Sequence, residues 1–492
     1  MNTNLQTKRD SYLFLAVAIL FLLVRLLVIS SYPLIDPSEG RYAEISREMV
    51  ATGDDGATGD WIVPHLDPDL PFWGKPPLYF WLAALCIKVF GLNEFSVRLP
   101  SFLFLCSSLL IMYFGAAGVF GSVIRARAAL ILTSTGLFYV LSGLTLVDSA
   151  FCFAVTVALT SLFLQRYWCW GILFAFGITL SLLAKGFLAI LILVPAACCW
   201  EFFAQAHTRV KTYSLLKLFA YIALGIAASV PWHILAEFHT PGFLSYYIIG
   251  EHFRRFTEPG WVSMYGSAHI EPYGFIWLFL GLSLLPWALL FPSGIIRSWQ
   301  KKKLSNLNLN CEPIPLQIIA FLLVWALLIP IIFTFSSGTM IPYLLPSLPA
   351  WSILLSLFIE RYLDLSPKKV VYLSSVVPAG FVLAALFILP LVGARRSEAW
   401  IKSGLVAEDD RLTYIERLPY SAQFYSDGEA TNLKGLTTNI IEERLDDLVS
   451  DIYVVEKKNT KDVTLLENNP SLKKILDNPK NIVFKESPKN AP

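Results

Sequence analysis

The sequence predicts a polytopic α-helical membrane protein with about eleven transmembrane helices, a large outer first loop that carries interfacial helices, and a small C-terminal α/β domain. Three observations predict this fold class. Hydrophobic residues make up 55% and charged residues only 15% of the 492 residues, more apolar surface than a water-soluble chain of this length buries. Apolar stretches long enough to span a bilayer recur through residues 1–393, whereas residues 394–492 are charged and contain short strand-like runs.

The first apolar stretch follows Lys8 and Arg9, which resembles a signal peptide, but no convincing small-residue cleavage site follows it. We therefore interpret it as the first span. The predicted spans are 12–31, 99–120, 128–146, 149–164, 168–184, 186–203, 216–235, 273–292, 316–334, 340–359 and 370–393.

The Leu78–Phe90 stretch decides the orientation of every later span. It is short and interrupted by Lys88, and we interpret it as an interfacial helix that does not cross. The basic connections then all fall on one side, which the positive-inside rule assigns to the cytoplasm. These are Lys8/Arg9, Arg125/Arg127, Arg166, Arg209/Lys211/Lys217, Arg297/Lys301/Lys302/Lys303 and Arg361/Lys368/Lys369. The outer side holds the 32–98 loop, Asp148, Lys185, the 236–272 loop, the 335–340 turn and residues 394–492.

Residues 394–492 are predicted to form a small outer domain, separate from the membrane domain of residues 1–393. Strand-like runs lie at Asp451–Glu456 and Asn481–Lys485, and helical patterns at Asn439–Val449 and Ser471–Asp477. The chain has a net charge of +2 and no basic domain, so we expect no nucleic-acid partner. Its seven cysteines lie in apolar runs or short connections without metal-ligand spacing, and we expect core thiols rather than a disulfide framework.

The outer first loop carries the most informative polar residues. Asp36, Glu39 and Glu44 flank Arg41 and could surround one cavity, although a solvated acidic loop is the alternative. Lys75 precedes two prolines that restrict the backbone, which suits a fixed cation for a phosphate at headgroup depth. An ordinary interfacial lysine is the alternative there.

Two charges interrupt apolar runs later in the chain. Asp148 and Lys185 are each surrounded by apolar residues, so they are expected either to face a cavity or to form a structural ion pair. Further on, Arg255 is a candidate anion ligand and Tyr343 a candidate donor to a phosphate oxygen. A metal at Glu251, His252, His269 and Glu271 was weighed, but the spacing matches no closed metal site.

The motifs resemble those of a known enzyme family. They are Asp36-Pro37-x-Glu39-Gly40-Arg41-Tyr42-Ala43-Glu44, Thr58-Gly59-Asp60-Trp61, Lys75-Pro76-Pro77, Arg98-Leu99-Pro100, Val147-Asp148, Ala184-Lys185-Gly186 and Tyr343-x-Leu345-Pro346. In this order they are similar to bacterial lipid-linked-sugar glycosyltransferases of the C-type membrane fold. The resemblance is to the aminoarabinose transferases that modify lipid A, relatives of the protein O-mannosyltransferases.

That resemblance implies a polyprenyl-phosphate-linked sugar donor, specifically an undecaprenyl phosphate sugar. The acceptor would be lipid A, another envelope glycan or a protein, on the periplasmic face of the bacterial inner membrane. The resemblance requires no cofactor, and a divalent metal is the alternative. A non-catalytic protein that binds or transports the polyprenyl-phosphate sugar is the alternative function. The implied roles are catalysis for Asp36, Glu39 and Asp148, donor phosphate binding for Arg41, Lys75, Lys185, Arg255 and Tyr343, and lining of the acceptor cavity for Glu251 and His252.

Three positions depart from the family pattern and leave the sugar, the acceptor and any metal requirement open. Ser38 occupies a position where the family has an acid, and Gly74 one where aminoarabinose transferases have a glutamate. A lysine usual in the 335–341 turn is also missing. Because Ser38 is not acidic, we expect Asp36 and Glu39 to face the cavity beside Arg41 and to act together as the base.

Overall fold

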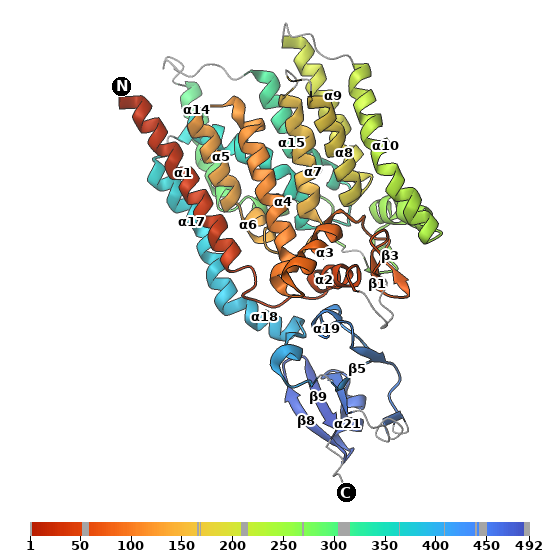
Figure 1. Cartoon of the computed structure of the whole chain (residues 1–492). Coiled ribbons are helices and arrows are strands. Elements are labelled where there is room, and N and C mark those ends of the chain that lie inside the picture. Colours follow the sequence, from red (N-terminus) through yellow and green to blue (C-terminus); the bar gives the residue numbers. More distant parts are fainter. Residues whose placement is uncertain are drawn as a thin grey trace.

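The protein is a helical bundle followed by a small domain with a mixed sheet, seen in a computed structural model (Figure 1). The bundle carries the first and last helices side by side at one edge, and the sheet domain lies beyond one end of it. The structure describes residues 2–51, 59–164, 167, 169–207, 215–267, 270–303, 315–363, 365–407, 409–437, 440–441 and 450–486.

The described helices confirm a multi-pass membrane protein. Six stretches are long and apolar enough to cross a bilayer, and a pair of helices bent by 93° adds a seventh, Ile276–Ser283 with Trp287–Arg297. The six are Gln6–Leu27, Glu94–Val119, Leu215–His239, Leu316–Phe333, Ile341–Leu363 and Pro367–Arg396. Shorter apolar helices lie at Leu78–Phe90, Asp148–Phe163, Trp170–Lys185 and Leu188–Phe202, so length and composition alone support fewer crossings than the predicted eleven.

Several helices of the bundle are interrupted or continue as a short helix of another type. The predicted 128–146 span, for example, is two helices that part at Thr135, where Gly136 N donates to Leu285 O at 2.8 Å instead of continuing the helix. The elements are α1 (Asn2–Leu27), α4 (Glu94–Phe114), η1 (Ala116–Val119), α5 (Ser122–Ser134), α6 (Gly136–Leu141), α7 (Asp148–Phe163), α8 (Trp170–Lys185), α9 (Leu188–His207), α10 (Leu215–His239), α13 (Ile276–Ser283), η3 (Trp287–Leu290), α14 (Phe291–Lys303), α15 (Leu316–Phe333), η4 (Ile341–Ser347), α16 (Leu348–Phe358), η5 (Ile359–Leu363), α17 (Pro367–Leu383), η6 (Ala384–Ile388) and α18 (Leu389–Arg396).

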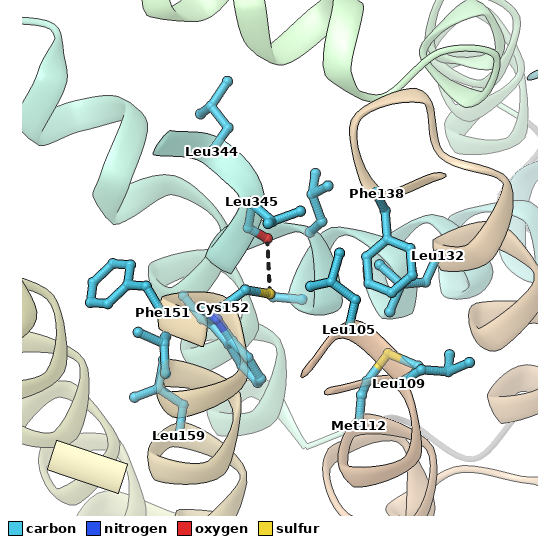
Figure 2. Close-up of a cluster of buried hydrophobic side chains, with 14 of the residues drawn as sticks. Leu105, Leu109, Met112, Leu132, Phe138, Phe151, Cys152, Leu159, Leu344 and Leu345 are labelled. Atoms are coloured by element: carbon cyan, nitrogen blue, oxygen red, sulfur yellow. Dashed lines mark hydrogen bonds between the residues drawn. The ribbon is translucent and has the colours of Figure 1, made fainter. Parts of the chain in front are cut away.

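The core of the bundle is apolar and closely packed around α4, α5, α7 and η4 (Figure 2). Cys152 lies in it, fully buried, with its Sγ 3.5 Å from the carbonyl oxygen of Leu345. The cysteines in the described residues are all free; Cys86 and Cys152 are buried, the other four are partly exposed, and Cys311 lies outside the described residues.

The loops between spans form short elements at the end of the bundle that faces the sheet domain (Figure 1). A helix covers the Leu78–Phe90 stretch as predicted, and Gly91, with φ 77°, ends it. The loop elements are α2 (Ser38–Glu48), β1 (His65–Asp67), β2 (Leu70–Pro71), α3 (Leu78–Phe90), α11 (Phe243–Ser245), η2 (Tyr246–Arg254), α12 (Arg255–Thr257), β3 (Val262–Ser263) and β4 (Gly266–Ser267).

The C-terminal domain contains a five-stranded sheet in the order β6-β5-β7-β9-β8, in which β6, β5 and β7 are parallel and β9 is antiparallel to both neighbours. The strands predicted at Asp451–Glu456 and near Asn481 are confirmed. The elements are η7 (Ala399–Ser403), β5 (Arg411–Ile415), α19 (Tyr420–Tyr425), β6 (Thr431–Leu433), β7 (Asp451–Glu456), α21 (Thr460–Glu467), β8 (Leu472–Asp477) and β9 (Asn481–Glu486).

The helix predicted at Ser471–Asp477 is wrong, because these residues form the edge strand β8. An irregularity between Lys474 and Leu476 shifts the register of β8 against β9 and interrupts the alternation of buried and exposed residues. Without regular alternation, the period of two that identifies a strand in a sequence is missing here. The helix predicted at Asn439–Val449 lies almost entirely outside the described residues.

A buried ion pair fixes α2 to the bundle. Arg98 donates from Nε to Glu39 Oε1 and from Nη2 to Glu39 Oε2, both at 2.9 Å, and neither side chain is more than 6% exposed. Glu39 also accepts the backbone N–H of Thr145, at 3.1 Å, and that of Ile35, at 3.1 Å. One carboxylate therefore joins the end of the first span, α2, α4 and the turn before α7.

We predict that Glu39→Gln destabilises the protein, because it leaves the Arg98 guanidinium buried without a counter-charge. Breaking such a pair typically costs about 3–5 kcal/mol. The variant should therefore show a clearly lowered apparent melting temperature in detergent. Glu258→Gln is the control, since the Arg254–Glu258 pair is 3.9 Å apart with both side chains more than half exposed, and surface pairs contribute about 0–1 kcal/mol. Equal stability of the two variants would contradict the prediction.

Candidate active site

A polar cavity of about 100 Å³ lies at the end of the bundle that carries α2 and α3. Its walls come from α2, the loop before α3, the start of α7, the end of α8, η2 and α12, the β3–β4 turn, and η4. The lining residues are Ser38, Arg41, Tyr42, Phe72, Gly74, Lys75, Leu146, Val147, Asp148, Lys185, Glu251, Arg255, Ser263, Tyr265, Gly266, Met340, Pro342 and Tyr343.

Charge distinguishes this cavity. The structure brings together seven of the ten residues singled out in the sequence, from segments as far apart as Arg41 and Tyr343. Four of the seven are cations and two are carboxylates, so the lining carries an excess of positive charge. A small cavity with that excess is suited to a dianionic group such as a phosphate.

Glu251 organises two of the cations. Its Oε2 accepts from Arg255 Nη1 at 2.8 Å and from Lys75 Nζ at 3.4 Å, and its side chain is 2% exposed. Burial raises the pKa of Glu251, but Lys75 and Arg255 outweigh that effect and hold the pKa below its ordinary value. Glu251 is therefore an ionised brace that keeps Lys75 and Arg255 close together.

Lys75 is held on a short loop before Pro76 and Pro77, and its Nζ also donates to the carbonyl oxygen of Gly74. Burial lowers the pKa of Lys75 to about 8, against the pull of Glu251 and with the help of the other cations of the cavity. The lysine is thus charged at neutral pH and loses its charge in mildly alkaline solution.

Asp148 and Lys185 form an ion pair with each other, and both side chains are less than 10% exposed. Asp148 is the first residue of α7, and Lys185 is the last residue of α8, where the following Gly186 has φ 71°. Lys185 Nζ also lies 4.1 Å from the centre of the Tyr343 ring. The sequence left open whether Asp148 and Lys185 form a structural ion pair or face a cavity. In the structure they do both.

Arg41 enters the cavity from α2. Its Nη1 donates to the carbonyl oxygen of Tyr265 at 3.1 Å, and its guanidinium lies over the rings of Tyr42 and Phe72. Its Nε is buried without a hydrogen-bond partner. A buried charged donor without a partner is costly, and an anion in the cavity would supply the missing charge.

A second, mainly apolar cavity of about 430 Å³ adjoins the first and shares Gly74, Lys75, Lys185, Glu251, Arg255 and Tyr343 with it. Its remaining walls include Phe187, Leu191, Phe253 and Phe256. The cations therefore lie at the boundary between a polar and an apolar chamber.

His252 lines only the apolar cavity. Its Nε2 accepts the backbone N–H of Phe187 at 3.1 Å, and burial holds its pKa below the ordinary value. The neutral ring thus positions the turn after α8, and the predicted cavity residue is found beside the polar cavity, not within it.

The prediction that Asp36 and Glu39 face the cavity beside Arg41 is wrong. Glu39 points to Arg98, on the other side of α2. Asp36 accepts from the hydroxyl and the backbone N–H of Ser421 in the C-terminal domain, and burial raises its pKa to about 6 against those hydrogen bonds. Asp36 precedes α2 and Glu39 is its second residue, and both hold the helix in place. Glu39 and Arg41 are two residues apart, so they do not share a face of the helix.

Residues that the sequence did not single out complete the cavity. Tyr265, on the β3–β4 turn, lines the polar cavity. Its hydroxyl accepts a hydrogen bond from the backbone N–H of Trp73 and donates one to the carbonyl oxygen of Pro71 at 2.7 Å. No spacing in the sequence links this tyrosine to the first loop. In the part of the chain that is described, no group of three or more histidine, cysteine or acidic side chains is arranged to hold a metal; His269 lies outside it.

The similarity to known proteins agrees with the motifs. Residues 74–234 match the family described as dolichyl-phosphate-mannose-protein mannosyltransferase. The undecaprenyl phosphate-alpha-4-amino-4-deoxy-L-arabinose arabinosyl transferase 1 of Pseudomonas fluorescens (strain Pf0-1) is 28% identical over 381 residues, 75% of this chain and 62% of that protein. Transferase 2 of the same name from P. fluorescens strain Pf-5 is 30% identical over 352 residues, 69% of this chain and 55% of that protein. The chain thus spans less than two thirds of these relatives.

The fold is that of a solved structure. The crystal structure of ArnT from Cupriavidus metallidurans bound to undecaprenyl phosphate superposes with a TM-score of 0.72 at 18% identity, covering 97% of this chain and 98% of that one. The resemblance to lipid-linked-sugar glycosyltransferases of the C-type membrane fold is confirmed.

Proposed function

We propose that this chain is a glycosyltransferase that moves a pentose, 4-amino-4-deoxy-L-arabinose, from undecaprenyl phosphate to lipid A on the periplasmic face of a bacterial inner membrane. One observation carries the proposal: a small chamber lined by four cations meets a larger apolar chamber at Lys75, Lys185 and Arg255. A sugar joined to a polyprenyl phosphate has that same division, with an anionic phosphodiester head, which gains a second negative charge when the sugar leaves, and a long apolar tail. The names of the arabinosyl transferases supply the sugar.

The cations would act on the leaving group. When the bond from the anomeric carbon to the phosphate oxygen breaks, negative charge collects on the polyprenyl phosphate. Lys75, Arg255 and Arg41 are already held by Glu251 and by Tyr265 O, so they stabilise that charge without rearranging. The apolar chamber, walled by Phe187, Leu191 and Phe256, receives the first isoprene units. Activation resides in the lipid donor itself.

The carboxylates favour a phosphate as acceptor. Asp148 and Glu251 are the acids of the polar cavity, and each is paired with a cation. A carboxylate engaged by a cation is poorly placed to take a proton from an acceptor, and a hydroxyl acceptor gains about 10²–10⁴-fold from a positioned base. A lipid A phosphate is ionised already and requires little help. Asp148 would then orient Lys185 rather than remove a proton.

The proposal includes the number of membrane crossings and the side of the membrane on which each loop lies. We take all eleven predicted stretches as crossings, with the short and broken helices included, and α3 as an interfacial helix. The basic connections then face the cytoplasm, and the cavity and the C-terminal domain face the periplasm.

We predict that Lys75→Ala lowers transfer by roughly 10²–10³-fold, the range found when one preorganised donor to a developing anion is removed. Lys88→Ala is the matched control. Lys88 lies on the next helix and stacks 4.9 Å from the centre of the Trp61 ring, away from the cavity lining. The readout is conversion of undecaprenyl-phosphate sugar by purified protein; equal losses in both variants would assign Lys75 a surface role only.

We predict that affinity for undecaprenyl phosphate falls as pH rises above about 8. Below its pKa of about 8 Lys75 is charged and attracts the phosphate, and above it the attraction is lost. Lys75→Arg keeps its charge throughout this range and should flatten the pH profile. Binding isotherms between pH 6.5 and 9.5 measure this, and a decline that persists in Lys75→Arg would locate the titration elsewhere.

We predict that cysteines placed at Asp69 and at Asn93, which precede and follow α3, are both labelled by a membrane-impermeant maleimide from the periplasmic side. Both positions lie on one side only if α3 does not cross. Labelling of the Asn93 position from the cytoplasm alone would reverse every later span and place the cavity on the wrong face.

A further inference from the structure

A basic cleft of about 440 Å³ lies between the bundle and the C-terminal domain, apart from the cavities described above. It is lined by Asp36, Pro37, Arg395, Arg396, Arg417, Leu418, Pro419, Tyr420 and Lys480. Its residues come from the start of α2, the end of α18, the connection after β5, and the residue before β9. The two domains therefore build it together.

Three of its four cations form no ion pair with a described side chain. Arg395, Arg396 and Arg417 are exposed, and among the described side chains no carboxylate lies within ion-pair distance of them. Lys480, by contrast, donates to the buried Glu398 at 2.6 Å. The carboxylate of Asp36 accepts a hydrogen bond from the hydroxyl of Ser421. The cleft thus presents three guanidinium groups, the side chain best shaped to bind phosphate oxygens in pairs.

The position of the arginine pair is unusual. Arg395 and Arg396 end the last candidate span, Pro367–Arg396, and Asp36 N donates to Arg396 O at 2.9 Å. They therefore lie at the end of the bundle that carries the polar cavity, which the proposed topology assigns to the periplasm. Positive charge is disfavoured on that side of a span, so a ligand that needs it would explain its presence.

The cleft is a neighbour of the polar cavity. Pro37 lines the cleft and the next residue, Ser38, lines the cavity, so the first turn of α2 is the wall between them. A molecule with two phosphates some distance apart could place one in each space at the membrane surface.

We propose that this cleft binds a phosphate-bearing lipid headgroup, and that the lipid is the acceptor, held by Arg395, Arg396 and Arg417 through the phosphate that does not react. The assignment to the acceptor rests on the proposed function. The binding of a lipid phosphate rests on the cleft alone.

The test uses full-length protein in phosphatidylcholine nanodiscs and the double variant Arg395→Gln/Arg396→Gln. Lys368→Gln/Lys369→Gln is the matched control, because it removes an exposed basic pair from the other end of the same span. Native mass spectrometry would measure binding of bisphosphorylated lipid A, of its dephosphorylated form, of phosphatidylglycerol and of inorganic phosphate. We expect the arginine variant to bind lipid A at least about tenfold more weakly, with the control unchanged and the dephosphorylated form bound poorly throughout.

Three results would overturn the proposal: equal loss in both double variants, undiminished binding of dephosphorylated lipid A, or displacement by inorganic phosphate at comparable concentrations. Displacement by phosphatidylglycerol would overturn the assignment to the acceptor. Steady-state transfer separates this proposal from the proposed function. The arginine variant should raise KM for lipid A and leave KM for the sugar donor unchanged. Absence of transfer in the unmodified protein would remove the glycosyltransferase function and the acceptor role, whereas transfer with an unaltered acceptor KM would remove the acceptor role alone.

Discussion

The buried pair between Glu39 and Arg98 is the interaction on which the rest of the site depends. A charge in this setting is tolerated only when it is fully compensated, and Arg98 is compensated by one carboxylate and by the carbonyl oxygens of Ile29, Tyr32 and Pro33. The end of α1, the start of α2 and α4 therefore have one mutual arrangement. Arg41, two residues after Glu39, is placed in the cavity as a consequence.

Within the polar cavity the buried charges are also compensated, but the compensation is incomplete. Glu251 compensates Lys75 and Arg255, and Asp148 compensates Lys185, but Arg41 has only carbonyl and aromatic partners. Four cations at one polar cavity repel one another. Burial, and to a smaller extent the neighbouring cations, lower the pKa of Lys75 to about 8. An anion that enters the cavity reduces this repulsion, so the excess of positive charge favours its binding.

The sequence predicted the fold class and most of the cavity, and its failures have physical causes. Lys75, Asp148, Lys185 and Arg255 could be found because an ionisable residue in an apolar or membrane-edge context needs a partner or a cavity. Asp36 and Glu39 satisfied that criterion equally well, but their partners, Ser421 and Arg98, are distant in sequence. Charge alone reports that a partner exists and does not reveal which one. Tyr265 was missed because its role depends on where a two-strand turn folds back.

The described part of the C-terminal domain contributes no residue to the lining of the polar or the apolar cavity, but it holds α2, which does line the polar cavity. One face of this helix presents Ser38 and Arg41 to the cavity. Its opposite face carries Arg47, which binds Glu44, Glu48 and the Asp427 carbonyl of the C-terminal domain. Asp36, just before the helix, binds Ser421 of α19. Contacts with the C-terminal domain hold α2 at both ends, and Arg41 lies on this helix. The docking of the C-terminal domain therefore determines the position of Arg41 in the cavity. The basic cleft lies on that joint, between the bundle and the domain, where an occupant touches both.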